Sequence, residues 1–262
     1  MDTMAGYKVF LSEDSFISGD RILLDPSESH HLCRVLRAKL GTSVQVLDGK
    51  GGLYQTQLVQ ALPKAAELAV LSRVNCERPS LDLHLVIGVL KPKAMDQVLK
   101  RAVEIGVTRI YPVLTEYGSF SLDAHQSLMK ASKWRTALIE ACKQSGNVFL
   151  PELMHTATLK SFLQEIGSNV ADSSLGIVAS TETGNDYMIE VLDCLKNGTD
   201  SIYFAVGPEG DFSPSEYRAL ATRGFLSSRL GAHVLRSETA VCYGLAVLDQ
   251  HRRLRTKNES DG

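Results

Sequence analysis

The stretch SIYFAVGPEGDFSPSE, residues 201–216, decides the fold class of this chain. An apolar run typical of a buried β-strand enters a loop with two glycines, and a helix-start signal follows at once. Ser213 is placed to cap that helix, Pro214 to occupy its first turn, and Glu216 to bond back to the cap. A strand, a glycine loop and a helix in succession indicate an α/β sheet whose loops bind ligands at the ends of the strands.

Two explanations of the glycine loop are open. Gly207 and Gly210 either let the backbone approach a ligand closely, or they supply the backbone angles of a tight turn. The loop has neither the GxGxxG pattern of dinucleotide-binding proteins nor the GxxxxGK[ST] pattern of nucleoside triphosphatases. Neither of those ligand classes is therefore indicated.

A second segment near the C-terminus has a similar form. LGAHVLRSETAVCYGLAVL, residues 230–248, predicts a glycine turn, a short strand over 233–235 and then an apolar helix. Arg236, Ser237 and Glu238 crowd at the start of that helix. Because charged groups are rarely buried without partners, they predict a buried, hydrogen-bonded site, with an ordinary capped helix as the alternative.

The rest of the chain changes its pattern near residue 75. The first part carries short β-like runs, with a hairpin over 44–59 and one helix that we expect to end at Gly41. The second part alternates strand-like and helix-like segments, beginning with a β-α-β unit over 81–115. That alternation predicts a mostly parallel sheet covered by helices on both faces.

Composition restricts the class of protein. The chain has 262 residues, 44% hydrophobic and 22% charged, with a formal net charge of −2, which excludes a strongly basic nucleic-acid binder. No apolar run reaches the roughly 20 residues that span a membrane, and the N-terminal sequence lacks signal-peptide features, so we expect a cytoplasmic protein. The cysteines lack metal-ligand spacing, and we expect free thiols and no metal at Cys33, Cys76, Cys142, Cys194 and Cys242.

Taken together, GPEGDFSPSE and LGAHVLRSETAVCYGLAVL closely resemble the signatures GPEGG(F/L)S and LGxR(V/I)LRTETA of the small-subunit ribosomal RNA methyltransferase E family. That family belongs to the SPOUT class of methyltransferases, which use S-adenosyl-L-methionine. The resemblance continues through HHLCRVLRAKLGTSVQVLDGKGG (30–52), RAVEIGVTRIYPVLTE (101–116) and EACKQSGNVFLPEL (140–153), in the order found in the family. It covers nearly the whole chain.

The resemblance implies a PUA-like, RNA-binding β-barrel in residues 1–75 and a SPOUT methyltransferase domain, with a parallel sheet and a trefoil knot, in residues 76–262. It implies methylation of N3 of a uridine in 16S ribosomal RNA, within the small ribosomal subunit, by a homodimer. The cofactor-binding residues that it implies are Ala179, Ser180, Val206, Gly207, Pro208, Glu209, Gly210, Leu230, Gly231, His233, Leu235, Arg236, Ser237 and Ala240.

The chemistry of that reaction indicates catalytic groups. Methyl transfer needs the nucleophile and the methyl carbon in line, about 3 to 3.5 Å apart. Uridine N3 must lose a proton, and a fixed positive charge, which we assign to Arg236, best stabilises the resulting anion. Either Glu238 or Glu209 would orient Arg236 or receive the proton. Candidate phosphate contacts are Arg34, Arg37, Lys91, Lys93, Lys100 and Arg101. The alternative, which any single lysine here favours, is a solvated helix surface.

Several positions depart from the family signature. Asp211 stands where a third glycine is usual, Ser237 replaces a threonine, and His233, Asn147 and Tyr117 stand where arginine is common. Fewer positive charges mean fewer phosphate contacts, so a paralogue acting on another RNA and a non-catalytic RNA-binding protein with a vestigial cofactor pocket are alternatives. A dinucleotide-dependent oxidoreductase is a third, which the absence of GxGxxG disfavours.

Overall fold

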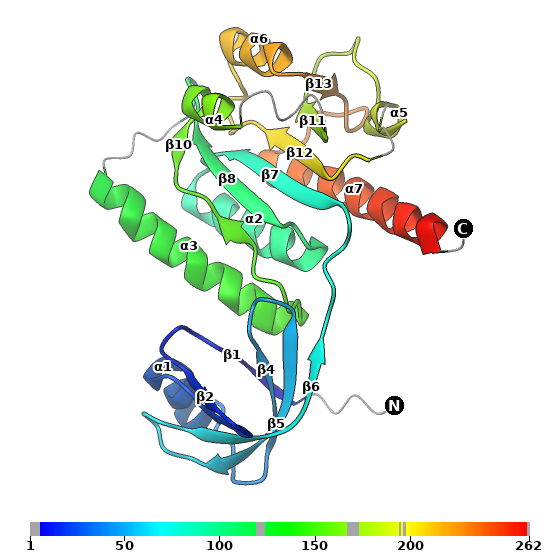
Figure 1. Cartoon of the computed structure of the whole chain (residues 1–262). Helices are drawn as coiled ribbons and strands as arrows, with labels where there is room; N and C mark the ends of the chain where they lie inside the picture. Colours follow the sequence, from blue (N-terminus) through cyan, green and yellow to red (C-terminus); the bar gives the residue numbers. More distant parts are fainter. Residues whose placement is uncertain (1–5, 119–123, 167–172, 194, 196–197, 261–262) are drawn as a thin grey trace. The chain divides into compact units, whose positions relative to one another are not determined.

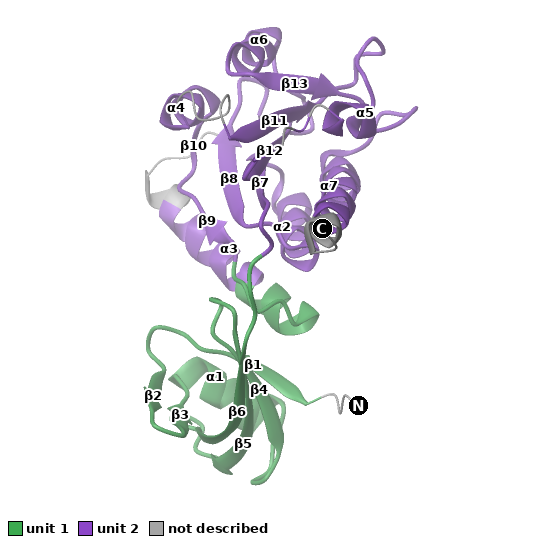
Figure 2. Ribbon diagram, turned by 45° about the vertical axis from the view of Figure 1, so that its right-hand side comes forward, with its two compact units in different colours: residues 1–78, 139–150 green, residues 79–138, 151–262 purple. Residues whose placement is uncertain are grey.

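The chain folds around two β-sheets (Figure 1). The computed structural model describes residues 6–118, 124–166, 173–193, 195 and 198–260. Unit 1 comprises residues 1–78 and 139–150, and unit 2 comprises residues 79–138 and 151–262 (Figure 2). Helix α3 (Ala124–Ser145) contributes to both units. Its last residues therefore group with the N-terminal part of the chain, although sequence alone places them in the C-terminal part.

Unit 2 is built on a parallel sheet with strand order β10-β8-β7-β12-β11-β13, and β9 pairs with β8. Every pairing between its described strands is parallel, as the alternation of strands and helices predicts. The strands are β7 (Asp82–Gly88), β8 (Arg109–Leu114), β9 (Glu152–Leu153), β10 (Ala157–Thr158), β11 (Ser174–Ala179), β12 (Ser201–Val206) and β13 (Phe225–Ser228).

Helices cover both faces of this sheet. On one face, Tyr203 of β12 shares a core with Phe162 of α4 and Leu220 of α6. On the other face, Gly244 of α7 lies so close to Phe204 that a Cβ there would come within 2.3 Å of the phenyl ring, and α2 runs beside α7 (Figure 1). The helices are α2 (Pro92–Ile105), α4 (Leu159–Glu165), α5 (Met188–Leu192), α6 (Pro214–Thr222) and α7 (Ser237–Ser260).

One strand in unit 2 is not where the sequence predicts it. Residues 233–235 form a loop, and the expected strand there is wrong. The edge of the sheet is instead occupied by β13, which pairs with β11 from Gly176 opposite Phe225 to Ala179 opposite Ser228. With that edge occupied, the apolar stretch at 233–235 leaves the sheet, and Val234 is 79% exposed.

Unit 1 contains a six-stranded sheet with strand order β1-β4-β5-β6-β3-β2. Its pairings are antiparallel except for β1 with β4, and the predicted hairpin is confirmed as β4 and β5. The carboxylate of Asp48 holds the hairpin loop by accepting hydrogen bonds from the backbone of Lys50 and Gly52. The strands are β1 (Tyr7–Phe10), β2 (Phe16–Ser18), β3 (Arg21–Leu23), β4 (Ser43–Leu47), β5 (Gly52–Gln60) and β6 (Glu67–Asn75).

The helix of unit 1 ends earlier than the sequence predicts. It consists of α1 (Pro26–His30) followed by a π-helical turn, η1 (His31–Val35), and does not reach Gly41. The chain leaves the helix at Arg37, whose φ of 53° is left-handed, and Ala38 N then bonds to Leu32 O. Because the chain turns here, Leu40 is exposed and does not complete an apolar helix face.

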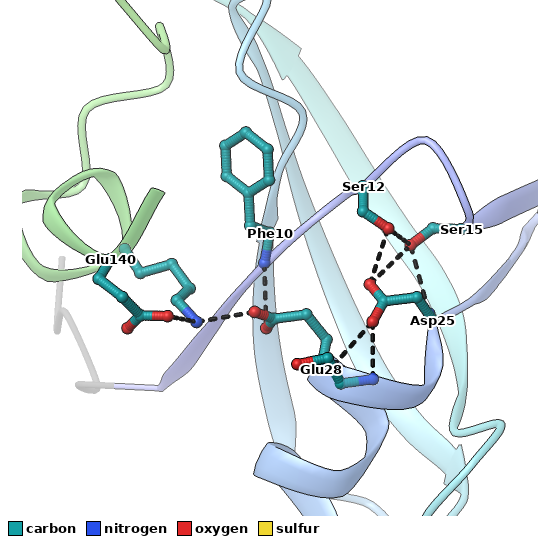
Figure 3. A network of polar contacts seen from close by, with 8 residues as sticks. Phe10, Ser12, Ser15, Asp25, Glu28 and Glu140 are labelled. Atoms are coloured by element: carbon teal, nitrogen blue, oxygen red, sulfur yellow. Dashed lines mark hydrogen bonds and ion pairs between the residues drawn. The ribbon is translucent and has the colours of Figure 1, made fainter. Parts of the chain in front are cut away.

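A buried polar network fixes the end of α3 within unit 1 (Figure 3). Lys143 is 7% exposed, and its Nζ lies 2.7 Å from carboxylate oxygens of both Glu28 and Glu140. Glu28 also accepts a hydrogen bond from Phe10 N, and Asp25 caps α1 by accepting from the backbone of residues 27 and 28. The buried charge of Lys143 is therefore paired with the carboxylates of Glu28 and Glu140.

Candidate functional site

A cavity of about 930 Å³ lies in unit 2 at the carboxyl ends of several strands. Its lining residues fall within 91–97, 179–183, 206–211 and 229–240. These segments follow β7, β11, β12 and β13, so loops far apart in sequence meet at one edge of the sheet. Open α/β sheets bind their ligands at this edge.

The loop after β12 lies close against neighbouring backbone. A Cβ on Gly88, at the end of β7, would come within 2.5 Å of Pro208 Cδ, and one on Gly207 within 2.8 Å of Asp211 Oδ1. A Cβ on Gly210 would come within 2.9 Å of Tyr117 O. Neither Gly207 nor Gly210 is among the described residues with a positive φ. The chain does make a tight turn here, because Asp211 N donates to Pro208 O at 2.9 Å, but neither glycine supplies a left-handed backbone angle to it. The two glycines instead leave room for Asp211 and Tyr117.

The helix after this loop begins as predicted. Ser213 Oγ accepts a hydrogen bond from Glu216 N at 3.2 Å, and Glu216 Oε2 accepts one from Ser213 N at 2.8 Å. Pro214 is the first residue of α6. This reciprocal capping satisfies two backbone donors and fixes the direction in which the loop leaves the cavity.

The departure from the family signature at Asp211 has a structural explanation. Asp211 has a φ of 63°, the left-handed conformation that glycine adopts freely and aspartate tolerates. Its Oδ1 lies 2.9 Å from the hydroxyl of Tyr217, which is 3.2 Å from Ala179 O. Burial, followed by the Asp211 carboxylate, raises the pKa of Tyr217, so the hydroxyl keeps its proton and donates. The Tyr217 hydroxyl thus connects Asp211, in the loop after β12, to Ala179 at the end of β11.

Substitutions at Asp211 test this connection through the free energy of unfolding. Asp211→Ala should lose about 2 to 3 kcal/mol, because alanine is strained at this φ and removes the acceptor for Tyr217. Asp211→Gly should lose only about 1 kcal/mol, because glycine adopts the backbone angle without strain. Asp211→Asn, the control, keeps the conformation and the acceptor oxygen and should stay close to the wild type. Urea unfolding measures the series, and equal losses for Ala and Gly would contradict it.

The charged residues before α7 lie at the rim of the cavity. Arg236 is exposed and Glu238 is half-buried, and neither side chain makes a hydrogen bond or ion pair with any residue that the structure describes. The expectation of a buried, hydrogen-bonded pair is therefore wrong. The reason is that α7 begins at Ser237 beside open space, so both charges face the cavity instead of a packed interior.

Most of the predicted cofactor residues come together in this one cavity. All of them line it except Gly210, which lies under the Tyr117 backbone. The catalytic candidates Arg236, Glu238 and Glu209 line it as well. Glu209 is exposed, and its Oε1 accepts a hydrogen bond from Lys91 N at 3.3 Å.

The candidate phosphate contacts are spread over the molecule. Lys91 and Lys93 are exposed and line the cavity. Lys100 and Arg101 are exposed on α2 and do not line it, and Arg101 is paired with Glu104 at 2.6 Å. Arg34 and Arg37 are exposed and belong to unit 1.

The lining residues that the sequence did not predict are Ala94, Gln97, Thr181, Thr183, Asp211, Arg229, Ala232 and Val234. Thr181 and Thr183 follow β11, and Arg229 follows β13. The carboxyl ends of parallel strands are the signal that finds such residues. Arg229 could not be found in this way because β13 was not predicted.

The described residues form neither a membrane-spanning helix nor a metal-binding cluster. No helix among them is long and apolar enough to cross a membrane, and no group of three or more His, Cys, Asp or Glu side chains is arranged to hold a metal ion. Cys194 lies outside the described residues, and the cysteines found as free thiols are Cys33, Cys76, Cys142 and Cys242.

Comparison with known proteins identifies the family. Residues 76–249 match the RNA methyltransferase domain family, and residues 24–71 match the RNA methyltransferase PUA domain family. The chain belongs to the RNA methyltransferase family. The family resemblance predicted from the motifs is thereby confirmed, and the 930 Å³ cavity lies within the RNA methyltransferase domain.

Relatives of this RNA methyltransferase match it over most of its length. It is 27% identical to ribosomal RNA small subunit methyltransferase E of Synechocystis sp., over 93% of this chain and 77% of that protein. It is also 27% identical to the Aquifex aeolicus protein of the same name, over 92% of this chain and 98% of that protein.

Two solved structures are similar over most of the chain. Ribosomal RNA small subunit methyltransferase E from Neisseria gonorrhoeae, bound to S-adenosyl methionine, superimposes with a TM-score of 0.82 at 25% identity and covers 93% of this chain and 96% of its own. A Legionella pneumophila protein in complex with the cofactor SAM gives a TM-score of 0.83 at 26% identity and covers 94% and 98%.

Proposed function

We propose that this RNA methyltransferase transfers a methyl group from S-adenosyl-L-methionine to N3 of a uridine in 16S ribosomal RNA. The observation that carries the proposal is the convergence of the GPEGD motif (207–211) and the LGAHVLRSETA motif (230–240) on one cavity. Relatives named for methylation of small-subunit ribosomal RNA, and two similar structures that hold this cofactor, support it.

The residues of the cavity fit the cofactor. Its volume of about 930 Å³ lies near the upper end of the roughly 300 to 1,000 Å³ found for small-molecule sites, which leaves space for a target base beside an adenosine. Val206, Leu230, Leu235 and Ala240 offer apolar surface, and the backbone is accessible at Gly207. When bound, the cofactor supplies an electrophilic methyl group on a sulfonium.

The side chains at the rim would handle charge and proton. Arg236 would stabilise the uridine anion as the N3 proton leaves, because a fixed cation is most effective where the negative charge develops. Glu209 already uses one oxygen to hold Lys91 N, whereas Glu238 has no bonding partner among the described residues. We therefore assign proton acceptance to Glu238 and positioning of the loop to Glu209.

The resemblance also gives the wider setting that we propose. Residues 1–75 would form a PUA-like barrel that binds RNA through exposed cations such as Arg34 and Arg37, and the PUA match over 24–71 supports this role. Residues 76–262 would form the SPOUT domain with its trefoil knot, acting as a cytoplasmic homodimer on the small ribosomal subunit. Lys91 and Lys93 would contact RNA phosphates beside the cavity.

A different RNA target is the second candidate. His233 at the cavity and Tyr117 beside Gly210 stand where the family signature commonly has arginine. Each lost phosphate contact weakens binding to the usual substrate and reduces its salt dependence.

The two candidates are distinguished by deletion of the gene. We expect 16S RNA from the deletion strain to lose one N3-methyluridine, detected by nucleoside mass spectrometry, and expect the wild-type gene to restore it. A matched control is the Arg218→Gln gene, which changes an exposed residue of α6 outside the cavity and should restore the nucleoside equally. An unchanged nucleoside profile, with cofactor binding intact by calorimetry, would contradict the 16S target and favour another RNA.

A further inference from the structure

Arg229 at the end of β13 lines the cavity but belongs to neither signature motif. Its backbone fastens the segment that follows β11: Arg229 N donates to Asp186 O at 2.9 Å, and Arg229 O accepts from Met188 N at 3.1 Å. Residues 181–187, here named the strap, are therefore held against the end of β13.

The guanidinium of Arg229 is held by the same strap. Its Nη1 donates to Thr183 O at 3.3 Å, and its central carbon lies 5.0 Å from the centre of the Tyr187 ring. A guanidinium supported by an aromatic ring and a carbonyl has lost much of its freedom before a ligand arrives. The side chain is thus preorganised at the wall of the cavity.

The positive charge of Arg229 has no carboxylate partner among the residues that the structure describes. A guanidinium carries five N–H donors, and one is used by Thr183 O. The residue is half-buried, in contrast to Lys91 and Lys93, which are exposed at the start of α2. A partly desolvated cation with free donors is suited to a bidentate oxyanion.

We propose that Arg229 binds the carboxylate of the amino-acid arm of S-adenosylmethionine. The inference rests on the proposed function, because it takes this cofactor as the ligand. Of the three charged groups of the cofactor, the sulfonium and the ammonium are positive and are repelled by a guanidinium, so the carboxylate alone is attracted. Thr181 and Thr183, in the strap that Arg229 holds, also line the cavity and would add short polar groups near the arm. The exposed lysines of α2 suit RNA phosphates better than this half-buried site does.

The test compares S-adenosylmethionine with its decarboxylated analogue by titration calorimetry on the full-length protein. The wild type should bind the cofactor about 10- to 100-fold more tightly than the analogue, the range expected for hydrogen bonds to a charged group. In Arg229→Gln this ratio should fall to within about threefold, through weaker cofactor binding, while the affinity for the analogue does not fall, because the analogue loses only the repulsion of its cations. Arg229→Lys should give an intermediate ratio. Arg218→Gln, an exposed residue of α6 outside the cavity, should keep the wild-type ratio.

The possible failures are distinct. Absence of cofactor binding to the wild type would overturn the proposed function together with this inference. If Arg229→Gln kept the wild-type ratio of cofactor to analogue affinity, only this inference would be overturned. Equal losses of affinity for both ligands would also overturn it, because they indicate a structural role for Arg229 in holding the strap. Unchanged cofactor binding with weakened RNA binding would make Arg229 a phosphate contact instead. Arg229→Lys keeps the cation and serves if the Gln variant does not fold.

Discussion

Replacing Arg236 with alanine is expected to lower the methylation rate by about 100- to 1,000-fold, the usual effect of removing one group that stabilises a developing anion. The free energy of unfolding should change by less than about 0.5 kcal/mol, because the side chain is exposed and unpaired among the described residues. A large loss of activity without a loss of stability is expected if the charge of Arg236 acts on the substrate and does not support the fold.

Single-turnover transfer of a labelled methyl group to small ribosomal subunits measures the rate, and urea unfolding measures stability. Arg236→Lys should recover part of the rate, since it keeps the positive charge but not the planar fork of donors. Arg218→Gln serves as the matched control and should retain full activity. A loss of stability that accounts for the lost activity would make Arg236 a structural residue.

Lys143→Ala is expected to produce the largest loss of stability, about 3 to 5 kcal/mol, because it leaves the largely buried Glu28 carboxylate without its cation. The ammonium of Lys143 is itself enclosed, and it reaches Glu28 at 2.7 Å. The matched control is Lys133→Ala on the same helix, whose side chain is 66% exposed and which should cost less than about 0.5 kcal/mol. Urea unfolding checks both variants.

A second substitution separates charge from packing at this position. Adding Glu28→Gln to Lys143→Ala should recover much of the loss, because the glutamine is neutral and still accepts from Phe10 N. Burial acts to lower the pKa of Lys143, but the bonds to Glu140 and Glu28 outweigh it and raise the pKa above its usual value. The stabilisation is therefore complete below the pKa of a free lysine and is lost as the pH rises through the raised pKa. No recovery in the double variant would show that packing, not charge, accounts for the loss.

Local features of unit 2 could be predicted because they depend on neighbouring residues. The Ser213 and Glu216 capping box needs only a spacing of three residues, and its two hydrogen bonds form as expected. The parallel sheet follows from the alternation of apolar strands and amphipathic helices. Predictions failed where distant elements compete, as at 233–235, where β13 takes the edge of the sheet.

The helix in unit 1 shows the same limit in another form. The spacing of apolar residues predicted a helix to Gly41, but the chain turns at Arg37 and forms a π-helical turn before it. The spacing of apolar residues indicates which of them could share one face of a helix. It does not indicate where the chain must leave the helix to reach the next strand.

By itself, the sequence determined the α/β class with its mostly parallel sheet, the family and most residues of the cavity, because strand patterns, caps and motifs are properties of neighbouring positions. Only the tertiary structure decided that Arg236 is exposed, that Asp211 bonds Tyr217, that Arg229 lines the cavity and that Lys143 pairs with Glu28. The last pair is separated by 115 residues. Such contacts follow from how elements distant in the sequence pack together, and no local pattern of residues encodes that packing.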